Sequence, residues 1–306
     1  MRRYGWMAVV ACGVLALVPA GALATNYGVI FSGGIDKENN YLRYDYETYQ
    51  MWQVMTGTLG YAVENVYVLF ADGTDPAEDR HIDDDEHGTV FIDSDWSDIV
   101  LAGGHIEAAT YDNLRNRLAF LQGAMTPEDC FYFWSFDHGY NTFYQTDAQG
   151  HVIHPAVQDE GGLCTWGWTW VRDDEFAAWV DPFDVKTECY AFGECFAGDM
   201  VDDLNIAGGD NRFAAYAADW YEPSYGSYWV AAWREAIESG LRSTHEIGDY
   251  AMTHDLAALA GKEHPGRVGA DFHIVTNEPI PEPVTALCVC LGWGALARYA
   301  RRRRRD

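Results

Sequence analysis

The feature of the sequence that most constrains the fold is an alternation of short apolar runs with longer segments of helical character. Five runs rich in β-branched and aromatic residues have the character of strands: residues 26–33, 65–73, 130–139, 188–198 and 212–219. Helical segments lie between or after them at residues 44–58, 109–125, 172–180, 227–240 and 245–261. This alternation predicts a mainly parallel sheet, and strands that are apolar throughout predict a sheet covered on both faces. We therefore expect one α/β domain, a three-layer sandwich over residues 25–276.

The N-terminal end differs from this alternating region. Arg2 and Arg3 precede an apolar run that ends in Ala22-Leu23-Ala24. A basic start, an apolar middle and small residues at the end are the pattern of a secretory signal peptide, so we expect residues 1–24 to be removed on export.

The C-terminal end carries a second targeting pattern over residues 277–306. Pro281-Glu282-Pro283 leads into an uncharged stretch, 284–297, and then into an arginine cluster. This order resembles the PEP-CTERM sorting signal of Gram-negative bacteria, which implies a linker, a short transmembrane helix, an Arg-rich tail and processing by a membrane enzyme of the exosortase type. The resemblance implies export to the cell surface or exterior with a transient inner-membrane anchor. The stretch has 14 residues, against roughly 20 for a spanning helix, and a buried core helix is the alternative.

The charge of the exported region excludes one class of partner. Residues 25–297 contain 12 Lys+Arg and 46 Asp+Glu, a net charge of −34. So acidic a surface repels phosphate groups, and no basic patch with interleaved aromatic residues is visible. We expect no binding to nucleic acid.

Four cysteines remain in the exported domain, at positions 130, 164, 189 and 195. An even number of cysteines in an oxidising compartment favours a structural role for them, as two disulfides. A working thiol at one position would leave an odd number to pair.

A histidine and a cysteine follow two of the expected strands at equivalent places. His138 and Gly139 come after the third strand, and Cys195 comes after the fourth. Carboxyl ends of neighbouring parallel strands meet at one edge of a sheet, where such folds place their sites. A thiol beside an imidazole is a candidate nucleophile, and the amides of Gly139 and Cys195 are candidate oxyanion donors. Either residue alone would more often be structural.

Asp137-His138-Gly139 after one apolar strand and Glu194-Cys195-Phe196-Ala197-Gly198 after the next resemble the legumain-type asparaginyl endopeptidases, relatives of the caspases. Val29–Gly34, Asn40-Tyr41-Leu42-Arg43 and Glu222-Pro223-Ser224-Tyr225 extend the resemblance over residues 26–260. It implies a caspase/haemoglobinase-like fold and a cysteine endopeptidase.

The resemblance implies roles for individual residues. Cys195 would be the nucleophile, His138 the proton-transfer partner and Asn40 the residue that orients His138. Arg43 is a candidate for reading the substrate side chain before the cleaved bond (P1), because a guanidinium grips a carboxylate or amide oxygen, with a plain solvated arginine as the alternative. Glu222 and Ser224 match a segment that lines the same pocket. Phe196 replaces an acidic residue of legumains, which leaves both Asn and Asp open at P1.

Two further stretches have alternative interpretations. Residues 71–98 are rich in carboxylates, but the EF-hand spacing fails because Ser94 stands where a bidentate Glu is needed. We interpret these residues as a solvated acidic loop, with a calcium-binding loop that is not an EF-hand as the alternative. Apart from that alternative, we expect no metal or cofactor. Trp166, Trp168 and Trp170 have the period of a strand face, which favours packing over a carbohydrate or peptide platform.

The sequence therefore predicts an exported cysteine endopeptidase acting on proteins or peptides. One alternative is a catalytically silent binding or adhesion module of the same fold at the cell surface. The other is a calcium-dependent extracellular matrix protein.

Overall fold

The computed structural model describes residues 24–84, 88–149, 151–158, 160–206 and 211–275. The expected sorting segment lies outside these ranges, as does the expected signal peptide apart from its last residue. Within the described ranges no helix is both long enough and apolar enough to cross a membrane.

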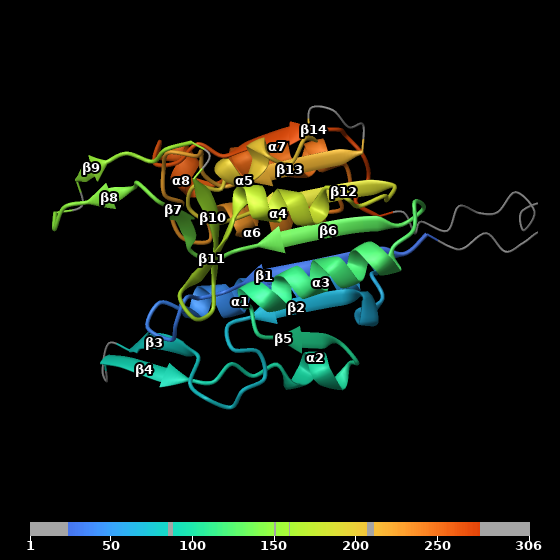
Figure 1. Cartoon of the computed structure of the whole chain (residues 1–306), viewed down its shortest axis with the longest axis horizontal. Helices are drawn as coiled ribbons and strands as arrows, with labels where there is room; N and C mark the ends of the chain where they lie inside the picture. The colour runs from blue at the N-terminus through green and yellow to red at the C-terminus, as the bar shows by residue number, and fades with distance from the viewer. Residues whose placement is uncertain (1–23, 85–87, 150, 159, 207–210, 276–306) are drawn as a thin grey trace, which may run out of the picture.

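A central sheet forms the middle layer of the described chain, with the strand order β14-β13-β12-β6-β1-β2-β5 (Figure 1). All neighbouring strands are parallel except β14, which runs antiparallel to β13 at the edge. The chain starts in the middle of the sheet, builds outward through β2 and β5, and then returns to the other side of β1. The carboxyl ends of β1 and β6 therefore flank a topological switch point. The strands are β1 (Asn26–Ser32), β2 (Val66–Phe70), β5 (His105–Glu107), β6 (Cys130–Ser135), β12 (Thr187–Phe192), β13 (Arg212–Tyr216) and β14 (Gly266–Gly269).

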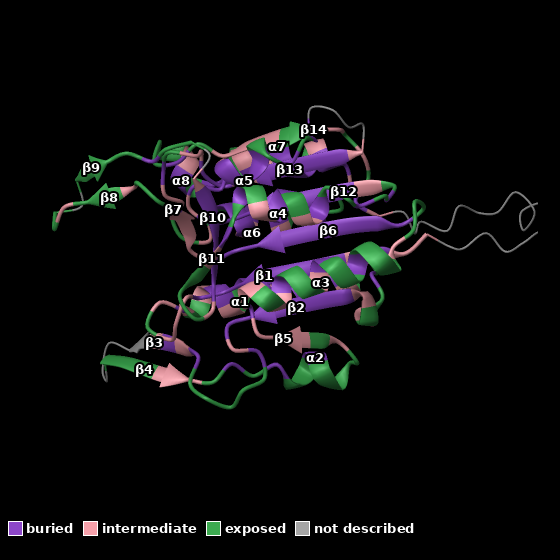
Figure 2. Cartoon of the chain, viewed as in Figure 1, coloured by how far each residue is buried: buried purple, intermediate pink, exposed green. Residues whose placement is uncertain are grey.

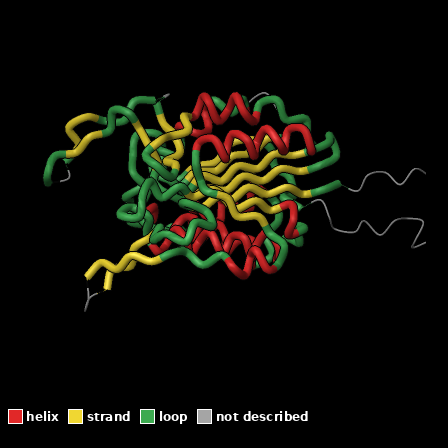
Figure 3. The backbone as a smooth tube through the Cα atoms, turned by 60° about the horizontal axis from the view of Figure 1, so that its bottom comes forward, coloured by secondary structure: helices red, strands yellow, loops and turns green. Residues whose placement is uncertain are grey.

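Helices cover both faces of this sheet (Figure 3). Helices α1, α6 and α7 bury their apolar side chains in one core, with a contribution from α2, and α3, α4 and α5 bury theirs in the other. The expected α/β three-layer sandwich is confirmed. The helices are α1 (Leu42–Gln53), α2 (Ser97–Leu101), α3 (Tyr111–Ala124), α4 (Asp173–Val180), α5 (Asp199–Asp202), α6 (Tyr228–Glu238), α7 (Thr244–His254) and α8 (Leu256–Leu259).

The local sequence explains where these elements form. Helix α3 begins after Thr110, whose side chain accepts a hydrogen bond from the amide of Asn113, and it buries Leu114, Leu118 and Leu121 completely. The five expected strands are all present; β2 and β6 are buried along their whole length, and β12 is buried except at Thr187 (Figure 2). The expected helix 44–58 is α1 continued by one turn of π-helix, Val54–Thr58.

Smaller hairpins project from the end of the sheet where the parallel strands finish. Strands β7, β10 and β11 form a three-stranded sheet, and β3 pairs with β4 and β8 with β9. Their sequences lack the long apolar runs of the central strands, and sequence analysis did not predict them as separate sheets. They are β3 (Arg80–Asp84), β4 (Gly88–Ile92), β7 (Gly139–Asn141), β8 (Gln145–Thr146), β9 (Val152–His154), β10 (Gly161–Thr165) and β11 (Thr169–Arg172).

Candidate active site

The segments that carry His138 and Cys195 leave the sheet side by side. Strands β6 and β12 are parallel neighbours, and their register pairs Ser135 with Phe192. His138 follows Ser135 by three positions and Cys195 follows Phe192 by three positions. The expectation that the two strand ends meet at one edge of the sheet is confirmed.

The backbone of Gly139 lies directly against that of Cys195. A Cβ atom at position 139 would stand 1.7 Å from the carbonyl oxygen of Cys195, far inside van der Waals contact. Only glycine fits this close approach. The missing side chain at position 139 therefore allows the segment after His138 to pack directly against the loop that carries Cys195.

A backbone amide hydrogen-bonds to the sulfur of Cys195. The amide of Ser224 lies 3.3 Å from Sγ, and the amide of Gly139, whose backbone adjoins that of Cys195, also lowers the pKa of the thiol. These donors favour the thiolate and lower its pKa. Burial, the largest effect, outweighs them, and the nearby carboxyls of Glu194 and Glu263 act in the same direction as burial. The pKa of Cys195 is consequently raised above its ordinary value, and the resting side chain is a thiol.

His138 is oriented by a backbone carbonyl. Its Nε2 lies 3.0 Å from the carbonyl oxygen of Asn39, which can only accept, so we assign the ring hydrogen to Nε2. Nδ1 then carries the lone pair. The imidazole also packs against the rings of Tyr41 and Tyr44, at centroid distances of 5.7 and 5.4 Å. These contacts hold the ring at the end of β6.

The structure corrects the role expected for Asn40. Its side chain is fully buried and donates from Nδ2 to the carbonyl oxygen of Asp79 at 2.8 Å. Its Oδ1 has no hydrogen-bond partner. The side chain therefore does not orient His138, and the preceding residue, Asn39, does so through its backbone. Sequence alone could not separate these roles, because a carbonyl oxygen is present at every position.

Asp137 is a site residue to which sequence analysis assigned no role. Its carboxylate accepts a hydrogen bond from the amide of Gly34 and so ties the loop after β1 to the segment that follows β6. Burial raises the pKa of Asp137 to about 6, although the neighbouring His138 and the amides lower it. The signal in the sequence was an acidic residue at the end of an otherwise apolar strand.

Arg43 is held beside this site by aromatic rings. Its guanidinium carbon lies 4.1 Å from the ring centroid of Tyr41 and 4.6 Å from that of Tyr44, and Nη2 donates to the Tyr44 hydroxyl at 3.0 Å. Within the described part of the chain no carboxylate pairs with it, and its buried Nε has no acceptor. Arg43 is thus a half-buried cation, stacked between rings rather than freely solvated.

The segment 222–225 reaches the site mainly through its backbone. The Ser224 amide binds the sulfur, whereas the carboxylate of Glu222 is directed to His264, whose Nδ1 lies 2.8 Å away. The expected pocket role of Glu222 is therefore corrected to a structural one. Behind the segment, buried Glu263 accepts a hydrogen bond from the Tyr225 amide at 2.6 Å, and burial together with Asp255 raises the pKa of Glu263 to about 9. Sequence analysis missed Glu263 because nothing local distinguishes it from a solvated acid.

Phe196 and the described cysteines complete the surroundings of the nucleophile. Phe196 adopts a left-handed backbone conformation, with φ of 59°, and packs against the ring of Tyr144 at 4.8 Å. Cys130, Cys164 and Cys189 are buried, and all four cysteines of the described chain are free thiols. The disulfide interpretation is therefore wrong for this structure.

The tryptophan-rich hairpin only partly matches its expected pattern. Trp166 and Trp168 lie in the turn between β10 and β11 instead of on a strand, and Trp170 stacks on Tyr140 with ring centroids 4.2 Å apart. A hollow of about 630 Å³ opens beside them and is lined by all three tryptophans. Trp168 is 59% exposed, so packing alone does not account for it.

The acidic stretch 71–98 contains a hairpin, in which β3 pairs with β4. Asp79 at its base is buried and accepts hydrogen bonds from the amide and hydroxyl of Ser94, both at 2.9 Å. Burial raises the pKa of Asp79 to about 7. Among the described residues of this stretch, no three carboxylates converge as metal ligands would.

Comparisons with known proteins give overall likeness only. No family model matches the sequence, and no curated protein does. The structure is similar to that of the protein GSU0716 from Geobacter sulfurreducens, with a TM-score of 0.46 and 12% identity over 83% of this chain and 95% of that one. It is also similar to drICE, with a TM-score of 0.45 and 9% identity over 82% of this chain and 91% of that one. Similarity at this level transfers no residue role.

Proposed function

We propose that the protein is an exported cysteine endopeptidase that hydrolyses peptide bonds through Cys195 and His138. The observation that carries the proposal is the position of the Cys195 sulfur, which accepts a hydrogen bond from the Ser224 amide at the edge of the sheet where the segment carrying His138 also leaves its strand.

In this mechanism the thiol gives its proton to Nδ1 of His138 as the sulfur attacks the substrate carbonyl carbon. The negative charge that develops on the carbonyl oxygen is stabilised by the amides of Gly139 and Cys195. His138 donates a proton to the leaving amine, and water then hydrolyses the thioester and restores the thiol. The raised pKa of Cys195 means that the thiolate forms during the reaction rather than at rest.

Arg43 supports a preference for an acidic or amide P1 residue, Asp or Asn. It is cationic, half-buried and without a carboxylate partner within the described chain, so it can bind a substrate carboxylate in two-pronged fashion. Ser224 borders the same site through its backbone. The sequence patterns at the two ends support export, an exosortase-type processing partner and a transient membrane anchor.

The test is cleavage of a peptide library by the full chain, compared with Cys195→Ala and His138→Ala. We expect cleavage to be lost in Cys195→Ala and iodoacetamide to label Cys195 in the folded wild type. Cleavage that persists in Cys195→Ala would overturn the proposal.

A binding module at the cell surface is the second candidate. The hollow beside the exposed Trp168 favours it, since a tryptophan-lined surface suits a carbohydrate or peptide ligand. Peptide binding without cleavage, unchanged in Cys195→Ala and lost in Trp168→Ala, would favour this candidate over the peptidase.

A further inference from the structure

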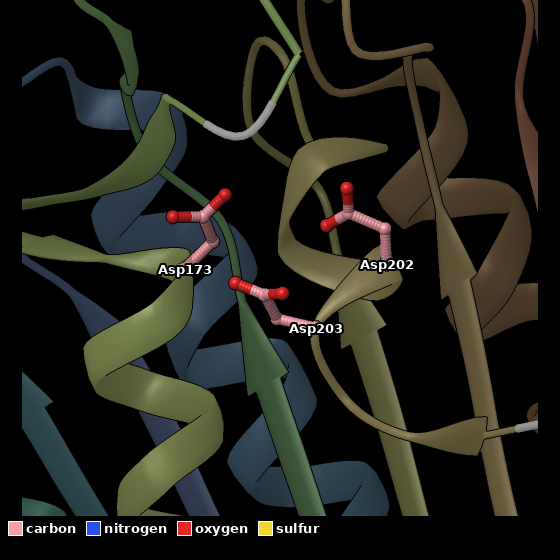
Figure 4. Close-up of side chains that lie close together, drawn as sticks. All are labelled: Asp173, Asp202 and Asp203. Atoms are coloured by element: carbon pink, nitrogen blue, oxygen red, sulfur yellow. The ribbon is translucent and has the colours of Figure 1, made fainter. Parts of the chain in front are cut away.

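Three aspartates on the face covered by α3, α4 and α5 direct their carboxylates towards a common space (Figure 4). Asp173 is the first residue of α4, Asp202 is the last residue of α5, and Asp203 follows it. One oxygen atom from each lies within 4.8 Å of the others. Among the described residues, this is the one group of three His, Cys, Asp or Glu side chains whose ligand atoms lie close enough together to bind one ion.

Asp173 is the residue of this group whose carboxylate is buried without a full set of hydrogen-bond partners. Its side chain is 1% exposed, and although Oδ1 accepts the amide of Asp174 at 2.9 Å, Oδ2 has no hydrogen-bond partner. A buried carboxylate oxygen without a donor is costly. No described lysine or arginine pairs with Asp173.

The chemistry of the three ligands points to calcium. Calcium binds oxygen ligands at about 2.4 Å, so two ligands on opposite sides of one ion stand about 4.8 Å apart, and it tolerates irregular geometry. Zinc prefers nitrogen and sulfur, and magnesium requires a tighter octahedron. Asp202 and Asp203 are exposed, which leaves room for water in the remaining coordination positions.

A hollow of about 210 Å³ opens beside the cluster and is lined by Asp203. Asp174 and Asp181 also line it, and they pair with Arg172 and Arg212 respectively. A hydrated cation can enter there and lose part of its water shell at Asp173. We propose that Asp173, Asp202 and Asp203 form a calcium site, distinct from the acidic stretch at 71–98.

The position of this site connects it to the nucleophile. Helix α5 begins at Asp199, four residues after Cys195. Asp199 already accepts a hydrogen bond at 3.2 Å from Nδ2 of Asn141, which lies in β7, the strand that begins at Gly139. An ion held by Asp173, Asp202 and Asp203 would join the end of α5 to the start of α4. Calcium would thereby stabilise the folded chain and fix the segment that leads away from Cys195.

The test is a calcium titration of the full chain at physiological ionic strength, followed by calorimetry and by thermal unfolding. We expect one saturable site and a rise in Tm with calcium, and a markedly weaker response to magnesium. Asp203→Asn should weaken binding by at least about tenfold, since it removes a charged ligand. It should also raise the Tm without calcium, because it relieves the repulsion on Asp173. Asp203 is exposed, so this variant should fold.

Asp184→Asn is the matched control, because it removes an equally exposed carboxylate just after α4 without touching the cluster. It should bind calcium as the wild type does. Absence of saturable binding, equal weakening in Asp184→Asn, binding retained in both Asp202→Asn and Asp203→Asn, or equal affinity for magnesium would overturn the proposal. Repeating the titration in Cys195→Ala makes the result independent of peptidase activity.

Discussion

The amide nitrogen of Ser224 lies 3.3 Å from the sulfur of Cys195, although 29 residues separate them in the sequence. Cys195 follows β12, and Ser224 belongs to the loop after the adjacent strand, β13. The contact therefore depends on the pairing of these two strands. The amide stabilises the thiolate of Cys195, whereas burial destabilises it. These two opposing effects on the pKa of the thiol determine how the site should respond to pH.

The first prediction concerns the pH dependence of Cys195 alkylation. Since burial holds the thiol pKa above its ordinary value, the rate of labelling by iodoacetamide in the folded protein should keep rising as the pH increases from 6 to about 9. Mass spectrometry of quenched samples locates the label and gives the rate. A rate that is already constant near pH 6 would mean a resting thiolate and would contradict this assignment.

The second prediction concerns the contact between Gly139 and Cys195. Gly139→Ala places a Cβ 1.7 Å from the Cys195 carbonyl oxygen, so the two segments must separate. We expect a loss of about 3 kcal/mol in the free energy of unfolding and loss of peptide cleavage. Gly123→Ala is the control, because Gly123 lies in α3 with no neighbouring atom within 4 Å of the new Cβ. It should be neutral or stabilising by up to about 1 kcal/mol; equal effects of the two substitutions on urea unfolding would refute the steric argument.

The third prediction concerns Glu194, which is 1% exposed and whose pKa burial raises to about 8. The folded state therefore binds a proton that the unfolded state releases above about pH 4.5, so this contribution to stability is complete at low pH and is lost as the pH rises through about 8. The free energy of unfolding should fall by about 4 kcal/mol between pH 5 and pH 8.5 from this group.

Glu194→Gln should flatten that dependence, because the amide stays neutral and can keep the hydrogen bond with Ser135 at 2.8 Å. Urea unfolding at several pH values provides the measurement. Asp112→Asn, at an exposed position of α3, should leave the slope as it is in the wild type. A slope that is the same in Glu194→Gln would show that Glu194 is ionised in the folded protein. Glu194→Gln should also lower the pKa of Cys195, because the Glu194 charge raises it.

The sequence predicts the framework of this site better than its details. The mainly apolar runs 130–135 and 188–192 are long enough to identify β6 and β12. The parallel pairing of these strands places His138 and Cys195 at the same edge of the sheet. The roles of Asn39, Asp137 and Glu263 depend on loop paths and burial that arise only after folding. Asn40 illustrates the limit, because its pattern matches an orienting residue while its side chain binds the Asp79 carbonyl.

The last prediction concerns Arg43 and substrate choice. Stacking on Tyr41 and Tyr44 positions its guanidinium without neutralising it, so a substrate carboxylate can be its partner. Arg43→Ala should lower kcat/KM for peptides with Asp at P1 by about 100-fold, which corresponds to about 2.7 kcal/mol, and should affect other P1 residues much less. Arg43→Lys should recover only part of the loss, because an ammonium cannot form the two-pronged contact. Arg115→Ala, which removes an exposed arginine paired with Asp112, controls for the change in net charge. If Arg43→Ala lowers cleavage of all peptides equally, Arg43 supports the Tyr41 and Tyr44 rings around His138 and does not read P1.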